Sequence, residues 1–350
     1  MAIVNTSNPS NAGIPAVLVA AIAAVVAMQG ASAASAPAGA AKPVAAMTAT
    51  PPEVSVQQIR PDVFVLTVGV VNTVVQSGPD GVVVVDPGPE GSAQAVVAAI
   101  RKISSLPIRY VVDTSSSPEH VANNGPLSQA GKSLSEETGT FSFGLPIEGG
   151  AALVAHENTT LRMVAPEPGV GPYPKVSLPR ETYSRPEKNF YLNGQAVVLM
   201  HAPAAHTDND TIVYFRSSDV VAAGDLMDMT RFPVINIAEG GSVNGLIDAL
   251  NRLLLLVIPV TPQQHLPGGT LLVPGRGQVC DQGEVVEYRD MVTIIRDRVK
   301  SLIDEGKSLE QVKAADPAQG YRSRYGADTG SWTTDKFVEA VFKSLSKDAG

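Results

Sequence analysis

A polar loop in the first half of the chain carries residues that can do chemistry. The stretch TSSSPEH begins at Thr114 and ends on an acid and a histidine, Glu119 and His120. Two further candidates lie later in the chain, His206 in AAHTDND and Asp225 in AAGDLMD. Histidine nitrogens and carboxylate oxygens are ligands that zinc and other divalent metals take in proteins. The loop therefore looks built for a metal site, although most of the expected ligands are missing.

The three serines of the loop suggest a second chemistry, a serine nucleophile beside His120 or His206. Such a nucleophile needs a base within reach and a third group that orients the base. No Gly-x-Ser-x-Gly sequence surrounds Ser115, Ser116 or Ser117. Replacement of metal ligands by small polar residues explains these serines better than a nucleophilic role does.

Apolar segments lead into each candidate residue. Strands are expected at residues 64–69, 71–77, 82–88 and 108–114, because these runs are rich in valine and bounded by turn residues. Amphipathic helices are expected at 92–105, with Ser92 as the N-cap, and at 243–257, 284–306 and 333–347. Two rounds of strands followed by helices predict an α/β fold, a four-layer αββα sandwich of two mixed β-sheets flanked by helices.

The N-terminal segment has a different composition from the rest of the chain. No charged residue precedes Lys42, and an apolar run from Ile14 to Met28 is followed by small residues with A-x-A spacing. Residues 1–33 are therefore predicted to be a signal peptide cut after Ala33, so that the protein is exported and periplasmic or secreted. The alternative is an uncleaved membrane anchor, for which this run is marginally long. Residues 34–52 are expected to form an Ala/Pro-rich linker, and residues 53–350 one folded domain with a C-terminal helical extension.

The composition is that of a globular protein and argues against some kinds of partner. The chain has 350 residues, 44% hydrophobic and 17% charged, which is ordinary for a globular protein. A net charge of −8 without a basic block argues against nucleic-acid binding. The single cysteine, Cys280, excludes an internal disulfide. We expect no membrane contact beyond the signal peptide, and the sequence leaves the small-molecule ligand or substrate and the oligomeric state open.

Five blocks, taken in chain order, resemble the metallo-β-lactamase superfamily. They are VVVVDPG, TSSSPEH, AAHTDND, AAGDLMD and PGRG, and all fall within residues 54–300. In the family these blocks are a strand ending in Asp, a Thr-His-x-His-x-Asp-His loop, a lone His, a Gly-Asp after a strand and a Pro-Gly-His-Gly turn. The resemblance implies the αββα fold and two metal ions, usually zinc, that generate a hydroxide for hydrolysis.

Carried over position by position, the resemblance implies that the first metal site is lost. Its three ligands would stand at positions 115, 117 and 206, which here are Ser115, Ser117 and His206. A neutral serine hydroxyl is a poor zinc ligand, so two of the three ligands are missing.

The second site would use Glu119, His120, Asp225 and Arg276. A guanidinium has no lone pair and stays protonated, so we expect Arg276 to pair with Glu119 and Asp225 in place of an ion. Two hypotheses remain. In one, Glu119, His120 and Asp225, together with His206, hold one zinc or other divalent ion, and the protein hydrolyses an ester, lactam or related bond. In the other no metal binds, and the protein is a non-catalytic pseudoenzyme that acts by binding or scaffolding.

The remaining candidates have simpler interpretations. By the resemblance, Asp86 braces the metal loop from behind, although an aspartate that starts the turn before a Pro-Gly pair explains it equally well. His156 and His201 are expected to be structural or half-buried, and His265 to be exposed. Cys280 is expected to be a small buried residue rather than a nucleophile.

Overall fold

The computed structural model describes residues 52–138, 149–165, 173–260 and 269–348. The chain divides into two units, Met1–Thr48 and Ala49–Gly350, and the description below concerns the second. The predicted signal peptide, nearly all of the predicted linker and His265 lie outside the described residues. Within the described ranges, no helix is both long enough and apolar enough to cross a membrane.

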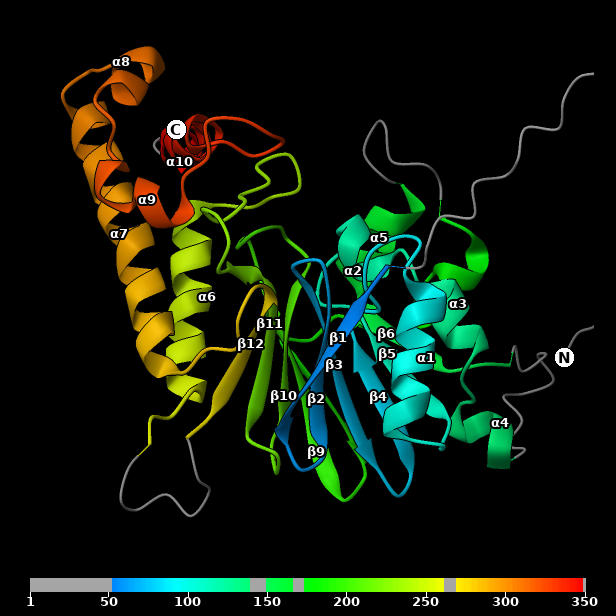
Figure 1. Ribbon diagram of the computed structural model, residues 1–350. Helices are drawn as coiled ribbons and strands as arrows, with labels where there is room; N and C mark the ends of the chain where they lie inside the picture. Colours follow the sequence, from blue (N-terminus) through cyan, green and yellow to red (C-terminus); the bar gives the residue numbers. More distant parts are fainter. Residues whose placement is uncertain (1–51, 139–148, 166–172, 261–268, 349–350) are drawn as a thin grey trace, which may run out of the picture. The chain divides into compact units, whose positions relative to one another are not determined.

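A mixed β-sheet runs through the described domain (Figure 1). Its strands lie in the order β7-β6-β5-β4-β3-β12-β11-β10-β9-β8, and β2 pairs with both β1 and β3. The strands are β1 (Val54–Arg60), β2 (Val63–Val68), β3 (Val71–Gly78), β4 (Gly81–Val85), β5 (Ile108–Val112), β6 (Ala152–His156), β7 (Glu181–Tyr183), β8 (Glu187–Leu192), β9 (Gln195–Ala202), β10 (Asp210–Phe215), β11 (Val220–Asp228) and β12 (Leu271–Arg276).

The valine runs seen in the sequence form the central strands. β4, with the sequence GVVVV, is buried along its whole length. It pairs antiparallel with β3 and parallel with β5. Valine suits this position because its branched side chain is restricted at χ1 and packs well on a pleated surface that is covered on both faces.

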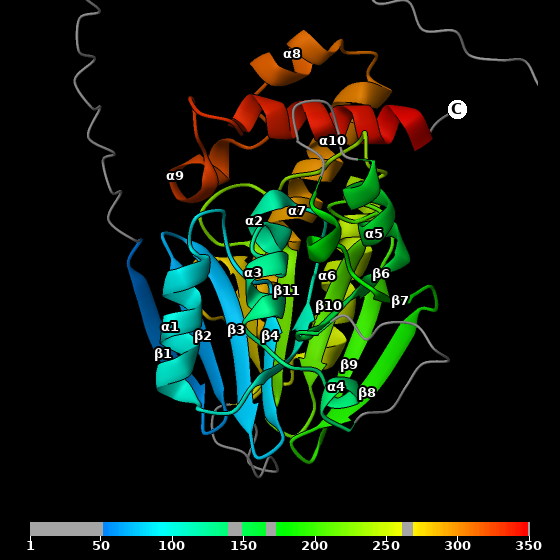
Figure 2. The same ribbon diagram turned by 90° about the vertical axis from the view of Figure 1, so that its right-hand side faces the viewer.

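Helices lie on both sides of the sheet (Figure 1). On one side are α1 (Ala93–Ile103) and α3 (Asn124–Gln129), and on the other α6 (Val243–Leu256) and α7 (Gln282–Asp304). Helix α10 (Thr334–Asp348) lies across the ends of this second group (Figure 2). The shorter helices are α2 (Pro118–Val121), α4 (Leu134–Thr138), η1 (Lys175–Ser177), α5 (Glu157–Val164), α8 (Leu309–Ala314), η2 (Gln319–Tyr321) and α9 (Arg322–Tyr325).

Three hydrophobic clusters hold these elements together. One joins α1 and α3 to strands β2–β6. A second joins α6, α7 and α10 to β9, β10 and β11. The third, which we call the middle cluster, contains only strand residues among its buried members, from β2–β7 and from β8–β12. A mixed α/β domain with a large mixed sheet and flanking helices, as predicted, is therefore confirmed.

The sheet consists of two contiguous stretches of chain that meet at one seam. Strands β1–β7 come from the first stretch and β8–β12 from the second, and among the strands of the described residues only β3 and β12 pair across the seam. Their pairing consists of one position, Val71 opposite Arg276. The side-chain amide of Asn72 strengthens it by donating to the carbonyls of Pro274 and Gly277, 3.0 and 2.8 Å away.

The predicted helices begin and end within two residues of the observed ones, but the start of α1 differs from the prediction in detail. Ser92 precedes the helix, yet its hydroxyl makes no capping bond to the helix backbone. It donates instead to the carbonyl of Pro89, 2.6 Å away, and accepts from the amide of Asn123, 2.8 Å away. Ser92 thus fixes the turn that follows β4.

Candidate functional site

The polar loop that follows β5 is tied to the segment between β9 and β10. The backbone N–H of Ser116 donates to Asn209 Oδ1 over 2.9 Å, and Asn209 Nδ2 donates back to Ser116 Oγ over 3.1 Å. The N–H of Thr211 donates to the carbonyl of Thr114 over 2.7 Å. These bonds bring the serines of one segment beside His206 of the other. Asn209 was not singled out from the sequence, since its partner lies about a hundred residues away.

His120 lies at the centre of the site, completely buried, between two carboxylates. Its Nε2 is 3.0 Å from Asp225 Oδ1 and hydrogen-bonded to it. Its Nδ1 is 2.8 Å from Asp86 Oδ2, close enough for an ion pair but not aligned as a hydrogen bond. Burial alone would lower the pKa of His120, but Asp225 and Asp86 outweigh it and raise that pKa well above its usual value. The two carboxylates therefore favour the protonated form of His120.

Asp86 directly follows β4 and has a left-handed backbone conformation, with φ at +57°. Such a conformation is strained for a residue other than glycine and needs local compensation. Thr114 supplies it, because its N–H and its hydroxyl donate to the two carboxylate oxygens of Asp86 over 2.8 and 2.7 Å. The strained turn thus aims the Asp86 carboxylate at His120 and the polar loop.

Asp225 contacts several other polar side chains of the site. Its Oδ2 accepts hydrogen bonds from Ser117 Oγ at 2.6 Å and Ser115 Oγ at 3.0 Å. Burial would raise the pKa of Asp225, but His120 and His206 outweigh it and hold that pKa well below its usual range. Both serine protons point at a carboxylate rather than at a histidine, so neither hydroxyl is arranged as a nucleophile with a histidine base.

His206 lies on the far side of Asp225 from His120. Its Nδ1 is 3.3 Å from Asp210 Oδ1 and 3.7 Å from Asp225 Oδ2. Burial would lower the pKa of His206, but Asp225 and Asp210 raise it above its usual value. Asp210 is in turn held by the N–H and hydroxyl of Thr207, at 2.7 and 3.0 Å. Asp210 was also not identified from the sequence, although its position four residues after His206 could have indicated a contact between the two side chains.

Arg276, at the end of β12, pairs with Glu119 of α2, as expected, but not with Asp225. Its second carboxylate is Asp228, whose Oδ2 is 3.6 Å from Arg276 Nε. Asp228 also accepts from Arg231 Nε over 2.7 Å and from the N–H and hydroxyl of Thr230. The predicted Arg276–Asp225 pairing is therefore wrong.

A register shift explains the change of partner. Gly224 is opposite Pro274 and Asp228 is opposite Arg276, so β11 uses four residues where β12 uses two. Gly224 makes this possible with a left-handed φ of +51°, and a Cβ there would lie 2.2 Å from Thr114 Oγ1. The irregularity brings Asp228 beside Arg276, while Asp225 contacts His120 instead. Simple alternation along the strand gives no sign of this arrangement.

The residues of the site do not fit the metal centre that the resemblance implies. A metal-binding histidine offers a neutral nitrogen lone pair, whereas His120 has a carboxylate against each ring nitrogen, an arrangement that favours the imidazolium. Asp225 already accepts two serine hydroxyls, and Arg276 is paired with Glu119. Across residues 52–348, outside the gaps named above, no three His, Cys, Asp or Glu side chains are grouped so that they could hold a metal ion.

The other candidate residues have structural partners. His156 precedes α5 and accepts from the N–H of Asn158, and its ring stacks on that of His201 with centroids 3.7 Å apart. Burial and the nearby His201 lower the pKa of His156 to about 4. Cys280 is buried, and burial together with two nearby acids raises its thiol pKa to about 12, so the thiol stays protonated.

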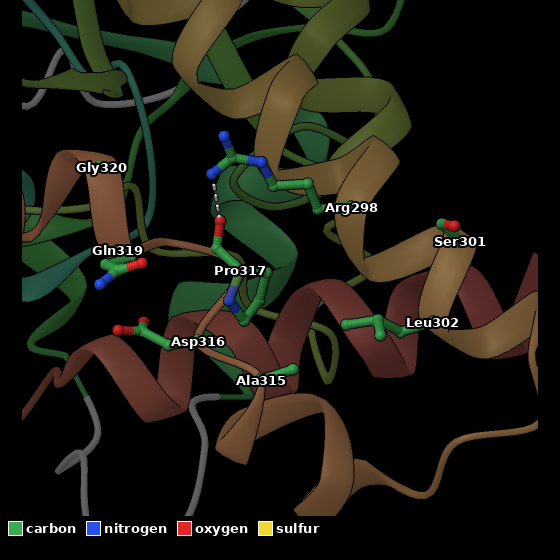
Figure 3. A pocket seen from close by; sticks show the side chains of 8 residues that line it. All are labelled: Arg298, Ser301, Leu302, Ala315, Asp316, Pro317, Gln319 and Gly320. Atoms are coloured by element: carbon green, nitrogen blue, oxygen red, sulfur yellow. Dashed lines mark hydrogen bonds between the residues drawn. The ribbon is translucent and has the colours of Figure 1, made fainter.

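A separate cavity of about 550 Å³ lies among the C-terminal helices. It is lined by Arg298, Ser301 and Leu302 of α7 and by the segment from Ala315 to Gly320 (Figure 3). Arg298 points toward this segment and donates to the carbonyl of Pro317 over 2.9 Å. None of the site residues described above lines this cavity.

Comparisons with known proteins identify solved structures with a similar fold. A search of curated proteins finds no significant match. Among solved structures, a double mutant of the sec-alkylsulfatase PisA1 superimposes with a TM-score of 0.61 at 14% identity, and the sec-alkylsulfatase Pisa1 from Pseudomonas sp. with 0.58 at 12%. Each match covers 83% of this chain but 50% of the sulfatase chain, so this chain spans half the length of those proteins.

A metallo-beta-lactamase from Pontibacter korlensis matches with a TM-score of 0.48 at 19% identity, over 69% of this chain and 99% of its own. The sequence model of the metallo-beta-lactamase superfamily matches residues 66–265, which is more than half of the chain. The ordered blocks, the mixed α/β fold and this match agree, and the protein belongs to the metallo-β-lactamase superfamily.

Proposed function

We propose that this protein is a metal-independent member of its superfamily that acts by binding or scaffolding rather than by hydrolysis. The observation that carries the proposal is the position of His120, fully buried with Asp86 and Asp225 on either side at 2.8 and 3.0 Å. Two carboxylates on either side of one imidazole favour a proton on each ring nitrogen. The histidine then has no lone pair to give to an ion.

The surrounding charges support the same proposal because they neutralise one another. Asp225 is balanced by His120 and His206, and Glu119 by Arg276. Buried carboxylates are stable only when paired and hydrogen-bonded, and here protonated side chains and hydroxyls meet that need. A metal ion entering this network would have to displace protons from histidine and break the serine hydrogen bonds.

A single-metal hydrolase is the second candidate. It is favoured by the gathering of His120 and His206 around Asp225, at 3.0 and 3.7 Å. In this alternative those residues and Glu119 hold one zinc or other divalent ion, and the substrate is an ester, lactam or related bond. The solved relatives are named as lactamase and sec-alkylsulfatase, which makes a sulfate ester one candidate substrate. At 12% identity, the similarity of the sulfatase to this chain shows a shared fold alone.

Metal content separates the two candidates. The protein is purified without chelator, dialysed against Zn²⁺ or Mn²⁺, and its metal content per chain is measured by mass spectrometry. We expect no stoichiometric ion and no rise in melting temperature on adding either metal. One tightly held ion that is lost in both His120→Ala and Asp225→Ala would refute the proposal and favour the hydrolase. Esters, lactams and sulfate esters would then be screened as substrates.

We also propose that the sheet folds into the predicted four-layer αββα sandwich. The support is the middle cluster, which joins strand residues of β2–β7 with those of β8–β12, while the other two clusters join strands to helices. The division into residues 1–33, 34–52 and 53–350, export to the periplasm or outside the cell, and an unidentified small-molecule ligand also remain proposals. N-terminal sequencing of the mature protein tests the first two of these.

A further inference from the structure

The cavity among the C-terminal helices has the size and lining of a small-molecule site. Its volume is about 550 Å³, within the range of roughly 300–1,000 Å³ that ligand pockets have. One wall is a single stripe of α7, formed by Arg298, Ser301 and Leu302 at helical spacing (Figure 3). The other wall is the turn from Ala315 to Gly320, which follows α8.

The hydrophobic core holds both walls in place. Val299, next to Arg298 on α7, is completely buried, and so is Ala318 in the opposite turn. The turn is closed by the N–H of Gln319, which donates to the carbonyl of Asp316 over 3.1 Å. Asp316 has a left-handed φ of +48°, a strained conformation that surrounding contacts must stabilise. The cavity is therefore formed before any ligand binds.

Arg298 brings a positive charge to this cavity that no carboxylate neutralises within the described part of the chain. Its Nη1 donates to the carbonyl of Pro317 over 2.9 Å, which fixes the guanidinium toward the turn (Figure 3). Asp316, the acid that lines the cavity, is paired with Arg322 over 2.8 Å. A guanidinium that is held in place and has no counter-charge is suited to bind an oxyanion.

We infer that this cavity binds an amphipathic carboxylate, whose charged group contacts Arg298 and whose apolar part lies against Leu302 and Pro317. A guanidinium has five N–H donors, so the bond to Pro317 leaves others for a ligand. The hydroxyl of Ser301 and the side-chain amide of Gln319 add donors from the two walls. The inference is independent of the charge network around His120, none of whose members lines this cavity.

Hexanoate is the probe, and hexanamide, which has the same shape and no charge, is the control ligand. Binding to the full-length protein is followed by nuclear magnetic resonance titration, which reports affinity and the residues that respond. We expect hexanoate to shift residues 298–302 and 315–320, and Arg298→Gln to weaken its binding about tenfold or more, because a charge-assisted hydrogen bond is lost. The matched control is Arg296→Gln, whose arginine pairs with Asp297 over 2.6 Å and does not line the cavity; it is expected to bind like the wild type.

Several results would overturn the inference. Hexanoate that leaves the cavity residues unshifted in the wild type shows that the cavity takes no carboxylate. Equal affinities of Arg298→Gln and the wild type, or of hexanamide and hexanoate, show that the guanidinium does not select the ligand. Ser301→Trp keeps the charge and fills the cavity, so it is a second variant that is expected to lose binding, and unchanged binding places the ligand elsewhere. Sedimentation that shows a second copy of the chain covering these residues makes the cavity an interface and also contradicts the inference.

Discussion

Replacing His120 by glutamine tests the proposed charge network most directly. Glutamine has a similar reach and can hydrogen-bond, but it cannot carry a positive charge. In the wild type the His120 side chain is fully buried, and its partners Asp86 and Asp225 are 5% and 13% exposed. The substitution therefore leaves two largely buried carboxylates without the cation between them.

The size of the effect follows from this burial. Removing one member of a buried ion pair costs about 3–5 kcal/mol, because the remaining charge stays desolvated. His120 serves two carboxylates, and His206 relieves only Asp225, at 3.7 Å. We therefore expect His120→Gln to lower the free energy of unfolding by about 3–5 kcal/mol, a large part of the roughly 5–15 kcal/mol of a typical domain.

Urea unfolding at neutral pH, followed by far-UV circular dichroism, measures the change. The matched control is His201→Gln, which removes a partly buried histidine that is not placed between carboxylates and is expected to cost about 1 kcal/mol. If His120→Gln lowers the free energy of unfolding by less than about 1 kcal/mol, His120 is uncharged in the wild type and the proposed charge network is refuted. A wild type that Zn²⁺ stabilises strongly, while His120→Gln is indifferent to the ion, would refute it as well.

Three further predictions concern other parts of the site. Gly224→Ala is expected to lose about 2–4 kcal/mol in urea unfolding, because Gly224 has a left-handed φ of +51° and a Cβ would lie 2.2 Å from Thr114 Oγ1; an unchanged midpoint would contradict the described register shift. Ser117→Ala is expected to cost about 1.5–3 kcal/mol in the same assay, since it removes the 2.6 Å bond to the Asp225 carboxylate, and no loss would mean that this bond is not formed in solution. His156 has a folded pKa of about 4 against a usual value of 6.5, so the unfolded chain binds more protons between these values and stability falls by roughly 3 kcal/mol as pH drops across that window. Thermal unfolding across this pH range should show a flatter profile for His156→Phe than for the wild type, and parallel profiles would contradict the lowered pKa.

Much of the fold was predictable because its signals are local. The valine run before Asp86 gave a buried strand, and the periodic segments gave α1, α6, α7 and α10 within two residues of their observed ends. The family was predictable because its blocks keep their order even where the ligands have changed. The four-layer arrangement depends on how distant strands pack, and it stays a prediction.

The chemistry of the site was less predictable because it depends on contacts between distant segments. The expected loss of ligands at Ser115 and Ser117 and the pairing of Arg276 with Glu119 followed from the resemblance to the family, carried over position by position. The partner Asp228 did not, since it depends on register shifts in β11 that the sequence does not indicate. Nor did the raised pKa of His120, which depends on Asp225, a residue far along the chain, lying 3.0 Å from its ring.

The single seam between β3 and β12 has a consequence for biosynthesis. Strands β1–β7 and helices α1 and α3 are complete when the ribosome has made residue 183, before any strand of the second stretch exists. At that stage α1 and α3 can already cover one face of the nascent sheet, but the residues that it gives to the middle cluster have no partners. These residues can therefore complete their packing only when β8–β12 have been made, and until then the nascent chain carries an apolar surface that favours aggregation.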